Sequence, residues 1–151
     1  MKIVRKHEQE REQETRNDEC LLFEEEKKNG KKRVLVVDDD PLVVKVLYKP
    51  LVNAGYDVRI AKHGLEALQR VKEERPDLII LDILMPLLDG FKVARFLKFD
   101  KRYKDIPIIV LTSRATEGER KIGKQVGANE FLYKPFRVPQ VLNIVQRYLN
   151  A

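Results

Sequence analysis

The chain has 151 residues, of which 43% are hydrophobic and 36% charged, and its net charge is +6. This length suits one domain with a modest extension, and a charge excess this mild and dispersed does not indicate a nucleic-acid-binding protein. The one cysteine, Cys20, excludes an intramolecular disulfide, and because the sequence has neither a ~20-residue apolar run nor a signal-peptide core, we expect a cytoplasmic protein with no membrane insertion.

Residues 1–32 differ in composition from the rest of the chain. The stretch RKHEQEREQETRNDE mixes both signs of charge and contains no aliphatic or aromatic side chain. A helix there would have no apolar face to dock, and a coiled coil would lack its apolar a and d positions. We therefore predict a charged extension over 1–32, flexible or loosely helical, followed by a globular domain over 33–151.

From residue 33 onward, strand-like and helical segments alternate. Short runs rich in Val and Ile predict strands at 33–37, 57–61, 77–81, 106–111 and 130–133. Apolar spacing predicts helical segments around 42–47, 65–71, 93–97 and 138–145, and the polar segment 116–126 is the weakest helix prediction. Strands this apolar are typical of a sheet covered on both faces, so we expect an α/β fold with a parallel sheet.

Two local patterns bear on the first helix. Asp40 followed by Pro41 is typical of an N-cap and a first helical residue, which places the helix start just after the first strand. Pro50 falls inside the same helical segment, where we expect it to kink or shorten the helix.

Polar side chains stand at four predicted strand ends. In chain order they are Asp38, Asp39 and Asp40, then Asp82, then Thr112, then Lys134. In a parallel sheet these ends share one edge, and open α/β folds bind their ligands there. Each residue alone has an ordinary structural explanation, such as a helix cap, a turn or a loop lysine. Together at one edge they predict a functional site.

The chemistry of these residue types favours phosphoryl transfer. Carboxylates that converge repel one another, and oxygen ligands of this kind suit Mg²⁺. Asp82, held by its strand, can then act as a nucleophile on phosphorus and form an acyl phosphate. Lys134 adds a positive charge, and the Thr112 hydroxyl can donate a hydrogen bond to a phosphoryl oxygen.

The motifs VLVVDDDP, LIILDILMPLLDG, IIVLTSR, GLEALQRV and GANEFLYKPF resemble the receiver domain of bacterial two-component response regulators. The resemblance covers residues 33 to 149 and is greatest to a single-domain, chemotaxis-type regulator. It implies a flavodoxin-like, doubly wound sheet of five parallel strands in the order 2-1-3-4-5, with five helices. It also implies a signalling protein that catalyses its own phosphoryl transfer and acyl-phosphate hydrolysis, without separate small-molecule turnover.

The resemblance also implies roles for the acids. Asp38 and Asp39 match the acidic pair that binds Mg²⁺, with Asp39 the more direct ligand. Asp82 matches the phosphoacceptor, which takes its phosphoryl group from a histidine kinase or a histidine phosphotransfer protein and also contributes to the metal site. Leu84 matches the position whose backbone carbonyl completes that site.

A switch is implied as well. Thr112 and Lys134 match the residues that hold the phosphoryl group, and Phe131 matches the aromatic side chain that turns inward when Thr112 moves. The Lys134–Pro135 bond is cis in this family, which is plausible because X-Pro bonds adopt cis at low cost. The affected surface would comprise the fourth helix, the fifth strand and the fifth helix.

Besides Pro50, two positions depart from the commoner family pattern. Leu84 is apolar where polar residues are frequent, and Arg114 stands two residues beyond Thr112. Similar positions tune how fast water hydrolyses the acyl phosphate. Our hypothesis is that the bulk of Leu84 and Arg114 restricts the attacking water and lengthens the lifetime of the phosphorylated state.

No DNA-binding domain follows the last helix of this sequence, so we expect either that the output is a protein contact or that the sequence is a receiver excised from a larger protein. Candidate contact residues, which could equally serve solubility alone, are Lys121, Lys124, Arg137 and Arg147. One alternative is a receiver-like interaction module that works without phosphorylation. A second is a haloacid-dehalogenase-type phosphatase, whose Asp-x-Asp motif VLVVDDDP resembles. Such a phosphatase needs an acidic motif after its lysine, and residues 135–151 contain no Asp or Glu.

Overall fold

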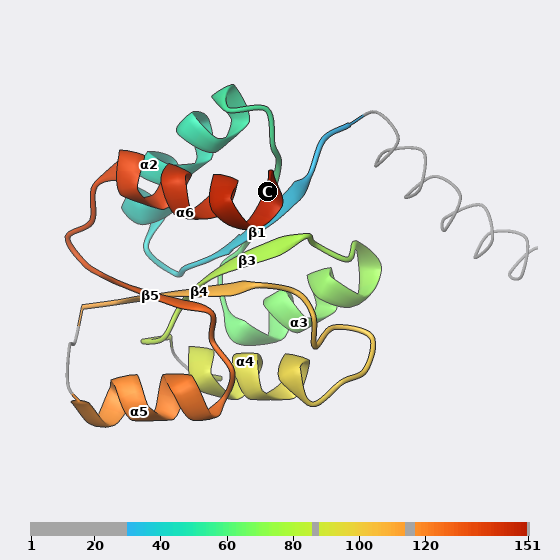
Figure 1. Cartoon of the computed structure of the whole chain (residues 1–151), viewed down its shortest axis with the longest axis vertical. Helices are drawn as coiled ribbons and strands as arrows, with labels where there is room; N and C mark the ends of the chain where they lie inside the picture. Colours follow the sequence, from blue (N-terminus) through green and yellow to red (C-terminus); the bar gives the residue numbers. More distant parts are fainter. Residues whose placement is uncertain (1–29, 86–87, 114–116, 151) are drawn as a thin grey trace, which may run out of the picture. The chain divides into compact units, whose positions relative to one another are not determined.

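The structure is a computed structural model that describes residues 30–85, 88–113 and 117–150 (Figure 1). The predictions about the extension up to residue 29 and about Arg114 lie outside these residues. Within the described part of the chain, helices are too short or too polar to cross a membrane.

Strands and helices alternate along the chain as predicted. The strands are β1 (Arg33–Val37), β2 (Asp57–Ala61), β3 (Leu78–Asp82), β4 (Ile108–Thr112) and β5 (Glu130–Tyr133). The helices are α2 (Pro41–Asn53), α3 (Gly64–Glu73), α4 (Gly90–Lys98), α5 (Glu117–Gln125) and α6 (Val138–Leu149). All strand pairs are parallel, and their order is β2-β1-β3-β4-β5. This confirms the predicted fold class and strand order, and the weak helix prediction at 116–126 corresponds to α5.

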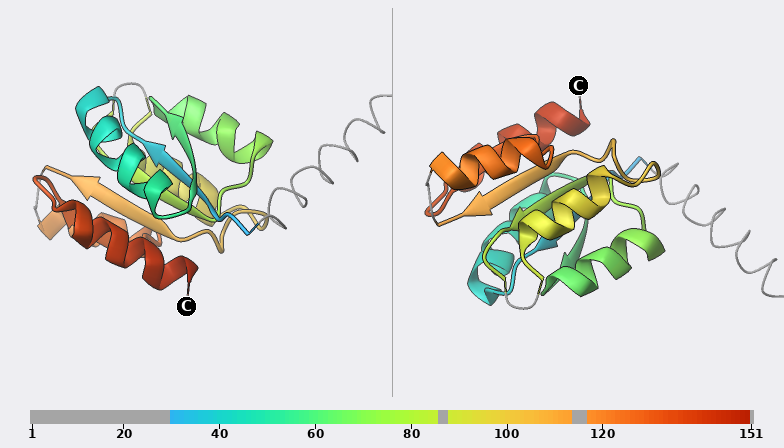
Figure 2. Two further views of the ribbon diagram at one scale, coloured as in Figure 1. Left: turned by 90° about the horizontal axis from the view of Figure 1, so that it is seen from above. Right: turned by 90° about the horizontal axis from the view of Figure 1, so that it is seen from below.

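The helices cover both faces of the sheet (Figure 2). Helices α2 and α6 lie on one face, and α3, α4 and α5 lie on the other. Successive strand residues point to opposite faces, so Val34 and Val36 join one core cluster while Leu35 and Val37 join the other. This double cover explains why the middle strands β1, β3 and β4 are apolar at every position except their end residues Arg33, Asp82 and Thr112.

Helix α2 confirms one local prediction and overturns another. The Asp40 side chain accepts a hydrogen bond from the backbone N–H of Leu42, as expected of an N-cap before Pro41. We expected Pro50 to kink or shorten the helix, and the shortening was wrong, because α2 continues to Asn53. Proline removes its own N–H donor and its ring crowds the carbonyl four residues earlier, yet helical hydrogen bonding continues beyond it: the N–H of residue 54 donates to the Pro50 carbonyl at 3.0 Å.

Candidate functional site

Three carboxylates meet at the carboxyl edge of the sheet. Oxygens of Asp38 and Asp39, just after β1, and of Asp82, the last residue of β3, all lie within 4.8 Å of one another. Asp38 and Asp82 are buried, with exposed fractions of 1% and 3%, whereas Asp39 is exposed. The Asp40 side chain instead caps the N-terminus of α2. The predicted acidic cluster is therefore formed by two buried acids and one accessible acid.

Lys134 lies beside the two buried acids. Its Nζ is 3.1 Å from Asp38 Oδ2 and 3.4 Å from Asp82 Oδ1. The backbone places it there, because β5 ends one residue earlier and the Lys134 N–H donates to the Thr112 carbonyl at 2.8 Å. The peptide bond between Lys134 and Pro135 is cis, as the resemblance implied.

The electrostatics of the site follow from this burial. Desolvation raises the pKa of Asp82 to about 6, and the charge of Asp38 adds to the rise. The charge of Lys134 and a backbone N–H from Leu84 oppose it. Burial by itself would lower the pKa of Lys134, but its hydrogen bond to Asp38 and the charges of both acids raise it. Three carboxylates against one ammonium leave an excess of negative charge at this edge.

The other predicted residues surround this cluster. Thr112, the last residue of β4, is fully buried, and Phe131 on β5 is half-buried against the core beneath α3, α4 and α5. Leu84 is 43% exposed, and its N–H lies 3.4 Å from Asp82 Oδ1. The structure thus brings every described candidate residue to the same edge of the sheet or to the adjoining strand.

Gly90 was not among the predicted site residues, although it holds the loop after Asp82 in place. Its N–H donates to the Ile83 carbonyl at 3.0 Å, and a Cβ at this position would overlap the Asp82 carbonyl oxygen. The preceding residue, Asp89, caps α4 by accepting from the N–H of Lys92. The Asp-Gly pair in the sequence was the available signal for this close packing.

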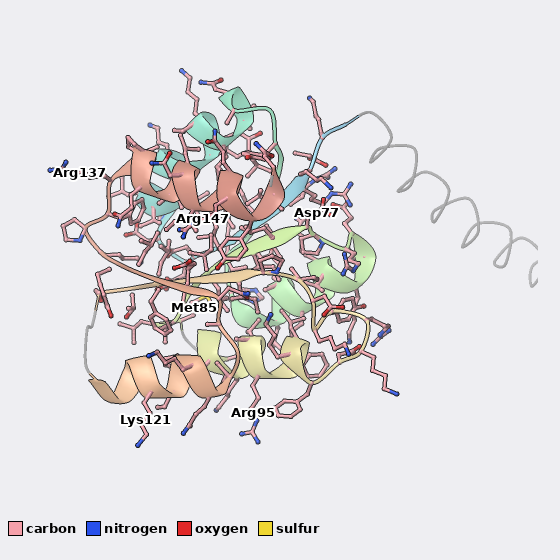
Figure 3. The ribbon with its side chains drawn as sticks, in the orientation of Figure 1. Asp77, Met85, Arg95, Lys121, Arg137 and Arg147 are labelled. Carbon is pink, nitrogen blue, oxygen red and sulfur yellow. The ribbon has the colours of Figure 1, made fainter. Side chains whose placement is uncertain are left out.

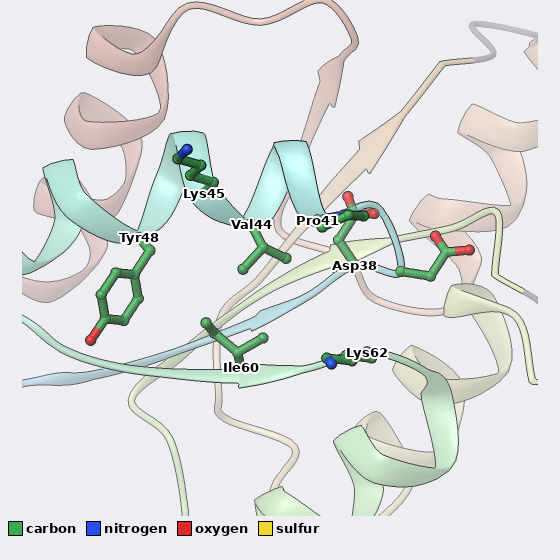
Figure 4. Close-up of a pocket in the computed structure, with 8 residues that line it drawn as sticks. Asp38, Pro41, Val44, Lys45, Tyr48, Ile60 and Lys62 are labelled. Carbon is green, nitrogen blue, oxygen red and sulfur yellow. The ribbon is translucent and has the colours of Figure 1, made fainter.

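A pocket of about 390 Å³ opens beside the acids, between α2 and β2 (Figure 4). Val44 and Tyr48 of α2 and Ile60 of β2 form its apolar wall. Asp38 and Asp39 lie at one end of it. No sequence pattern indicated this pocket, because its walls come from a helix and a strand that are apart in sequence.

The donor set fits a hard divalent cation. All three groups are carboxylates, and no sulfur or imidazole ligand belongs to the cluster. Mg²⁺ prefers such oxygen ligands and keeps several waters, and the accessible Asp39 leaves one side of the cluster open to them.

Comparison with known proteins assigns the family. The family model for the response regulator receiver domain matches residues 34–146. The chain belongs to this family. It is a receiver domain of two-component signalling, and the fold and strand order described above are those of a receiver.

Named relatives support the assignment. The receiver is 37% identical to the polar-differentiation response regulator DivK of Brucella anthropi over 105 residues, which are 69% of this chain and 85% of DivK. It is 42% identical to the response regulator MprA of Mycobacterium leprae over 96 residues, which are 64% of this chain and 41% of MprA. The chain therefore spans less than half the length of MprA.

Solved structures agree with the receiver fold. The chemotaxis protein CheY4 of Vibrio cholerae is 36% identical, with a TM-score of 0.75, and the match covers 79% of this chain and 99% of CheY4. The receiver domain of a sensor histidine kinase from Pseudomonas aeruginosa PAO1 is 31% identical, with a TM-score of 0.73 and coverage of 80% and 99%. That domain was solved with a magnesium ion coordinated in its active-site cleft.

Proposed function

We propose that this receiver accepts a phosphoryl group on Asp82 in a Mg²⁺-dependent reaction. One observation carries the proposal: the Asp82 carboxylate is almost fully buried, yet its oxygens lie among two further carboxylates and 3.4 Å from the Lys134 ammonium. A carboxylate in such a place is aimed by its strand and can attack phosphorus. The donor would be a phosphohistidine of a histidine kinase or of a histidine phosphotransfer protein.

The step exchanges one bond to phosphorus for another. An Asp82 oxygen attacks in line with the phosphorus–nitrogen bond of the phosphohistidine. As the new oxygen–phosphorus bond forms, the old bond breaks and its electron pair stays on the imidazole nitrogen. Lys134 stabilises the charge on the phosphoryl oxygens, and the Thr112 hydroxyl donates to one of them.

Asp38, Asp39 and Asp82, together with the backbone carbonyl of Leu84, would hold the magnesium ion. The ion, when bound, neutralises charge on the carboxylates and on the transferred phosphoryl group. Lys134 already neutralises the side of the cluster that faces β5. Asp39 is the accessible acid and therefore the one best placed to meet an arriving cation.

The exposed side of α2 suits a docking partner. Leu42 and Val46 are 70% and 48% exposed, and they are one turn apart on the helix that begins beside the acids. Exposed apolar side chains in such a row are typical of a protein contact. A kinase or phosphotransfer protein bound there would lie over the carboxyl edge of the sheet and next to the pocket of Figure 4.

Output would follow from a change in α5, β5 and α6. After phosphorylation, Thr112 moves toward the phosphoryl group, and Phe131 turns into the space that Thr112 leaves. Lys121 on α5 and Arg137 and Arg147 near α6 carry exposed positive charge on these elements (Figure 3). Arg147 also lies 3.5 Å from Glu130 of β5, so a shift of β5 would alter the charge presented to a partner.

Phosphate incorporation tests the proposal directly. The full chain is incubated with acetyl phosphate and Mg²⁺, and any added phosphate is located by mass spectrometry. We expect one phosphate, on Asp82, and none on an Asp82→Asn variant or in the presence of EDTA. Phosphate on another residue, or none at all, contradicts the proposal.

The interaction module that needs no phosphate is the remaining candidate. It is favoured if beryllofluoride, a phosphoryl mimic, leaves the amide NMR spectrum of the wild-type chain unchanged in the presence of Mg²⁺. The intact set of Asp38, Asp39, Asp82 and Lys134 argues against it, because a module of this kind has no need to keep two buried carboxylates beside a lysine. The phosphatase alternative has no support from the family match.

A further inference from the structure

The ring of Phe131 lies directly against the backbone of α5. A Cβ built at Gly123 would overlap the ring carbons Cζ and Cε2. Gly123 is buried, and the ring is half-buried between β5 and this helix. Because protein interiors are close-packed, the ring can take this position only while residue 123 has no side chain.

The same ring lies on the face of the sheet that holds Thr112. Val110 pairs with Phe131, and Thr112 pairs with Tyr133, so Thr112 is two residues further along the adjacent strand. Side chains two residues apart point to the same face, at a spacing of about 7 Å along the strand. Val110 and Phe131 belong to the same core cluster. Phe131 and Thr112 therefore project from neighbouring strands on the same face of the sheet, so a ring displaced from α5 has Thr112 as a neighbour along that face.

We infer that Gly123 is a positioning residue for Phe131 and sets how readily the receiver switches. Its missing side chain gives the ring a resting place against α5, and the ring in turn keeps the α5 backbone away from β5. When the ring turns toward Thr112, α5 is free to approach the sheet. The inference rests on the proposed function, in which Phe131 moves toward Thr112 after phosphorylation, and it adds the contact through which that movement reaches α5.

The effect of a methyl group at residue 123 has a defined direction. Alanine there penalises only the conformation in which the ring lies against α5. A change that destabilises one of two conformations shifts the population toward the other. The Gly123→Ala variant should therefore adopt the phosphorylated conformation more readily than the wild-type chain.

A matched control exists in the same helix. Glycine to alanine strengthens any helix by about 1 kcal/mol through propensity alone, and this effect must be separated from the contact with the ring. Gly118 also belongs to α5, and a Cβ there meets nothing within 4 Å. Gly118→Ala therefore also replaces a glycine of α5 by alanine, in its first turn, but leaves the ring of Phe131 untouched.

Beryllofluoride binding measures the shift. The full-length wild type, Gly123→Ala and Gly118→Ala are titrated with beryllofluoride in Mg²⁺ and followed by amide NMR. We expect Gly123→Ala to bind about five- to tenfold more tightly, in keeping with the penalty for one extra buried methyl group, and Gly118→Ala to bind like the wild type. Equal affinities for all three proteins, or weaker binding by Gly123→Ala, overturn the inference.

A second background shows whether the effect passes through the ring. In a Phe131→Ala variant, the change Gly123→Ala should no longer alter beryllofluoride affinity, because interaction energies vanish when one partner is removed. If Gly123→Ala alone fails to fold, the double variant should fold, since the overlapping ring is gone. An undiminished effect without the ring, or a double variant that still fails to fold, overturns the inference.

Failure of the proposed function has a different signature. In that case, the wild-type chain itself binds no beryllofluoride, and the switching role of Gly123 falls with it. The contact is tested separately by nuclear Overhauser effects between the Phe131 ring protons and the α-protons of Gly123 in the wild type. Their absence in the unphosphorylated chain overturns the inference even when beryllofluoride binds.

Discussion

The Nζ of Lys134 lies 3.1 Å from the Oδ2 of Asp38, and this ion pair joins residues 96 positions apart in the sequence. It links the end of β5 to the end of β1 across two intervening strands. Asp38 is fully buried, and its carboxylate oxygens bond to this partner and to the backbone N–H of Asp40, which donates at 2.9 Å. We therefore expect the lysine that we assign to phosphoryl binding also to stabilise the fold when no cation is bound.

We therefore predict that Lys134→Met destabilises the chain most in the absence of divalent cations. Removing one partner of a buried pair leaves the other charge uncompensated, and the free energy of unfolding should fall by about 1–3 kcal/mol in EDTA. Mg²⁺ should restore more stability to this variant than to the wild type, because the cation replaces the missing charge. Urea denaturation with EDTA or MgCl₂ measures both effects, and Lys121→Met, at an exposed position on α5, is the control. Equal unfolding free energies for Lys134→Met and the wild type in EDTA would contradict the prediction.

Asp82 should give the metal-free chain an unusual pH dependence. Its pKa rises from 3.8 to about 6 on folding, through burial and the charge of Asp38. Between these values the folded chain binds more protons than the unfolded chain, so stability falls as pH rises through this window. We expect a loss of about 2 kcal/mol between pH 4 and 6.5 from this group, and Asp82→Asn should flatten that part of the curve. Thermal unfolding in EDTA across this range is the measurement. A stability that rises equally in both proteins over the window is incompatible with the raised pKa.

The exposed acids Asp39 and Asp40 should differ sharply in their effect on Mg²⁺ binding. Asp39 belongs to the oxygen cluster, whereas Asp40 caps α2. Asp39→Asn should weaken Mg²⁺ binding at least tenfold, since removing one of three charges costs about 1.4 kcal/mol or more. Asp40→Asn should leave it nearly unchanged, because asparagine is an equally good N-cap. Isothermal titration with MgCl₂ compares the two, and similar losses in both variants would show that general negative charge, not the cluster, attracts the cation.

The strand ends were predictable from the sequence because each apolar run stops at a polar residue, and parallel strands bring those ends together. This placed Asp38, Asp82 and Lys134 correctly. What the sequence could not show were contacts between distant segments. Arg33 was counted only as a strand residue, yet it is buried, and its guanidinium bonds to Asp57 of the edge strand β2 at 3.1 Å. No local pattern marks such a pair.

The role of a glycine is equally hard to predict when it depends on a contact with a distant segment. Gly123 stands in a polar helix whose sequence gives no reason for it, and its purpose becomes visible only once β5 places the Phe131 ring against α5. Pro50 is the opposite case, because a strong local signal was outweighed by packing: Leu47 and Leu51 of α2 are both fully buried and hold the helix on the sheet past the proline.

The side chain of Leu84 should lengthen the lifetime of the phosphorylated state. It follows Asp82 by two residues, its N–H lies 3.4 Å from Asp82 Oδ1, and it is 43% exposed, so we expect its side chain to border the route by which water approaches the acyl phosphate. An apolar side chain there offers water no hydrogen bond and occupies part of its path. We expect Leu84→Asn and Leu84→Ala to shorten the half-life of the phosphorylated protein several-fold, whereas Leu84→Met, which keeps the volume, should leave it close to that of the wild type.

Decay of ³²P-labelled protein at fixed pH and Mg²⁺ gives the rates, and dephosphorylation in EDTA separates an effect on water from one on the metal. If Leu84→Asn decays as slowly as the wild type, the side chain does not shield the acyl phosphate. If dephosphorylation is fast in Leu84→Asn but not in Leu84→Ala, the rate is controlled by hydrogen bonding of the amide and not by the bulk of Leu84.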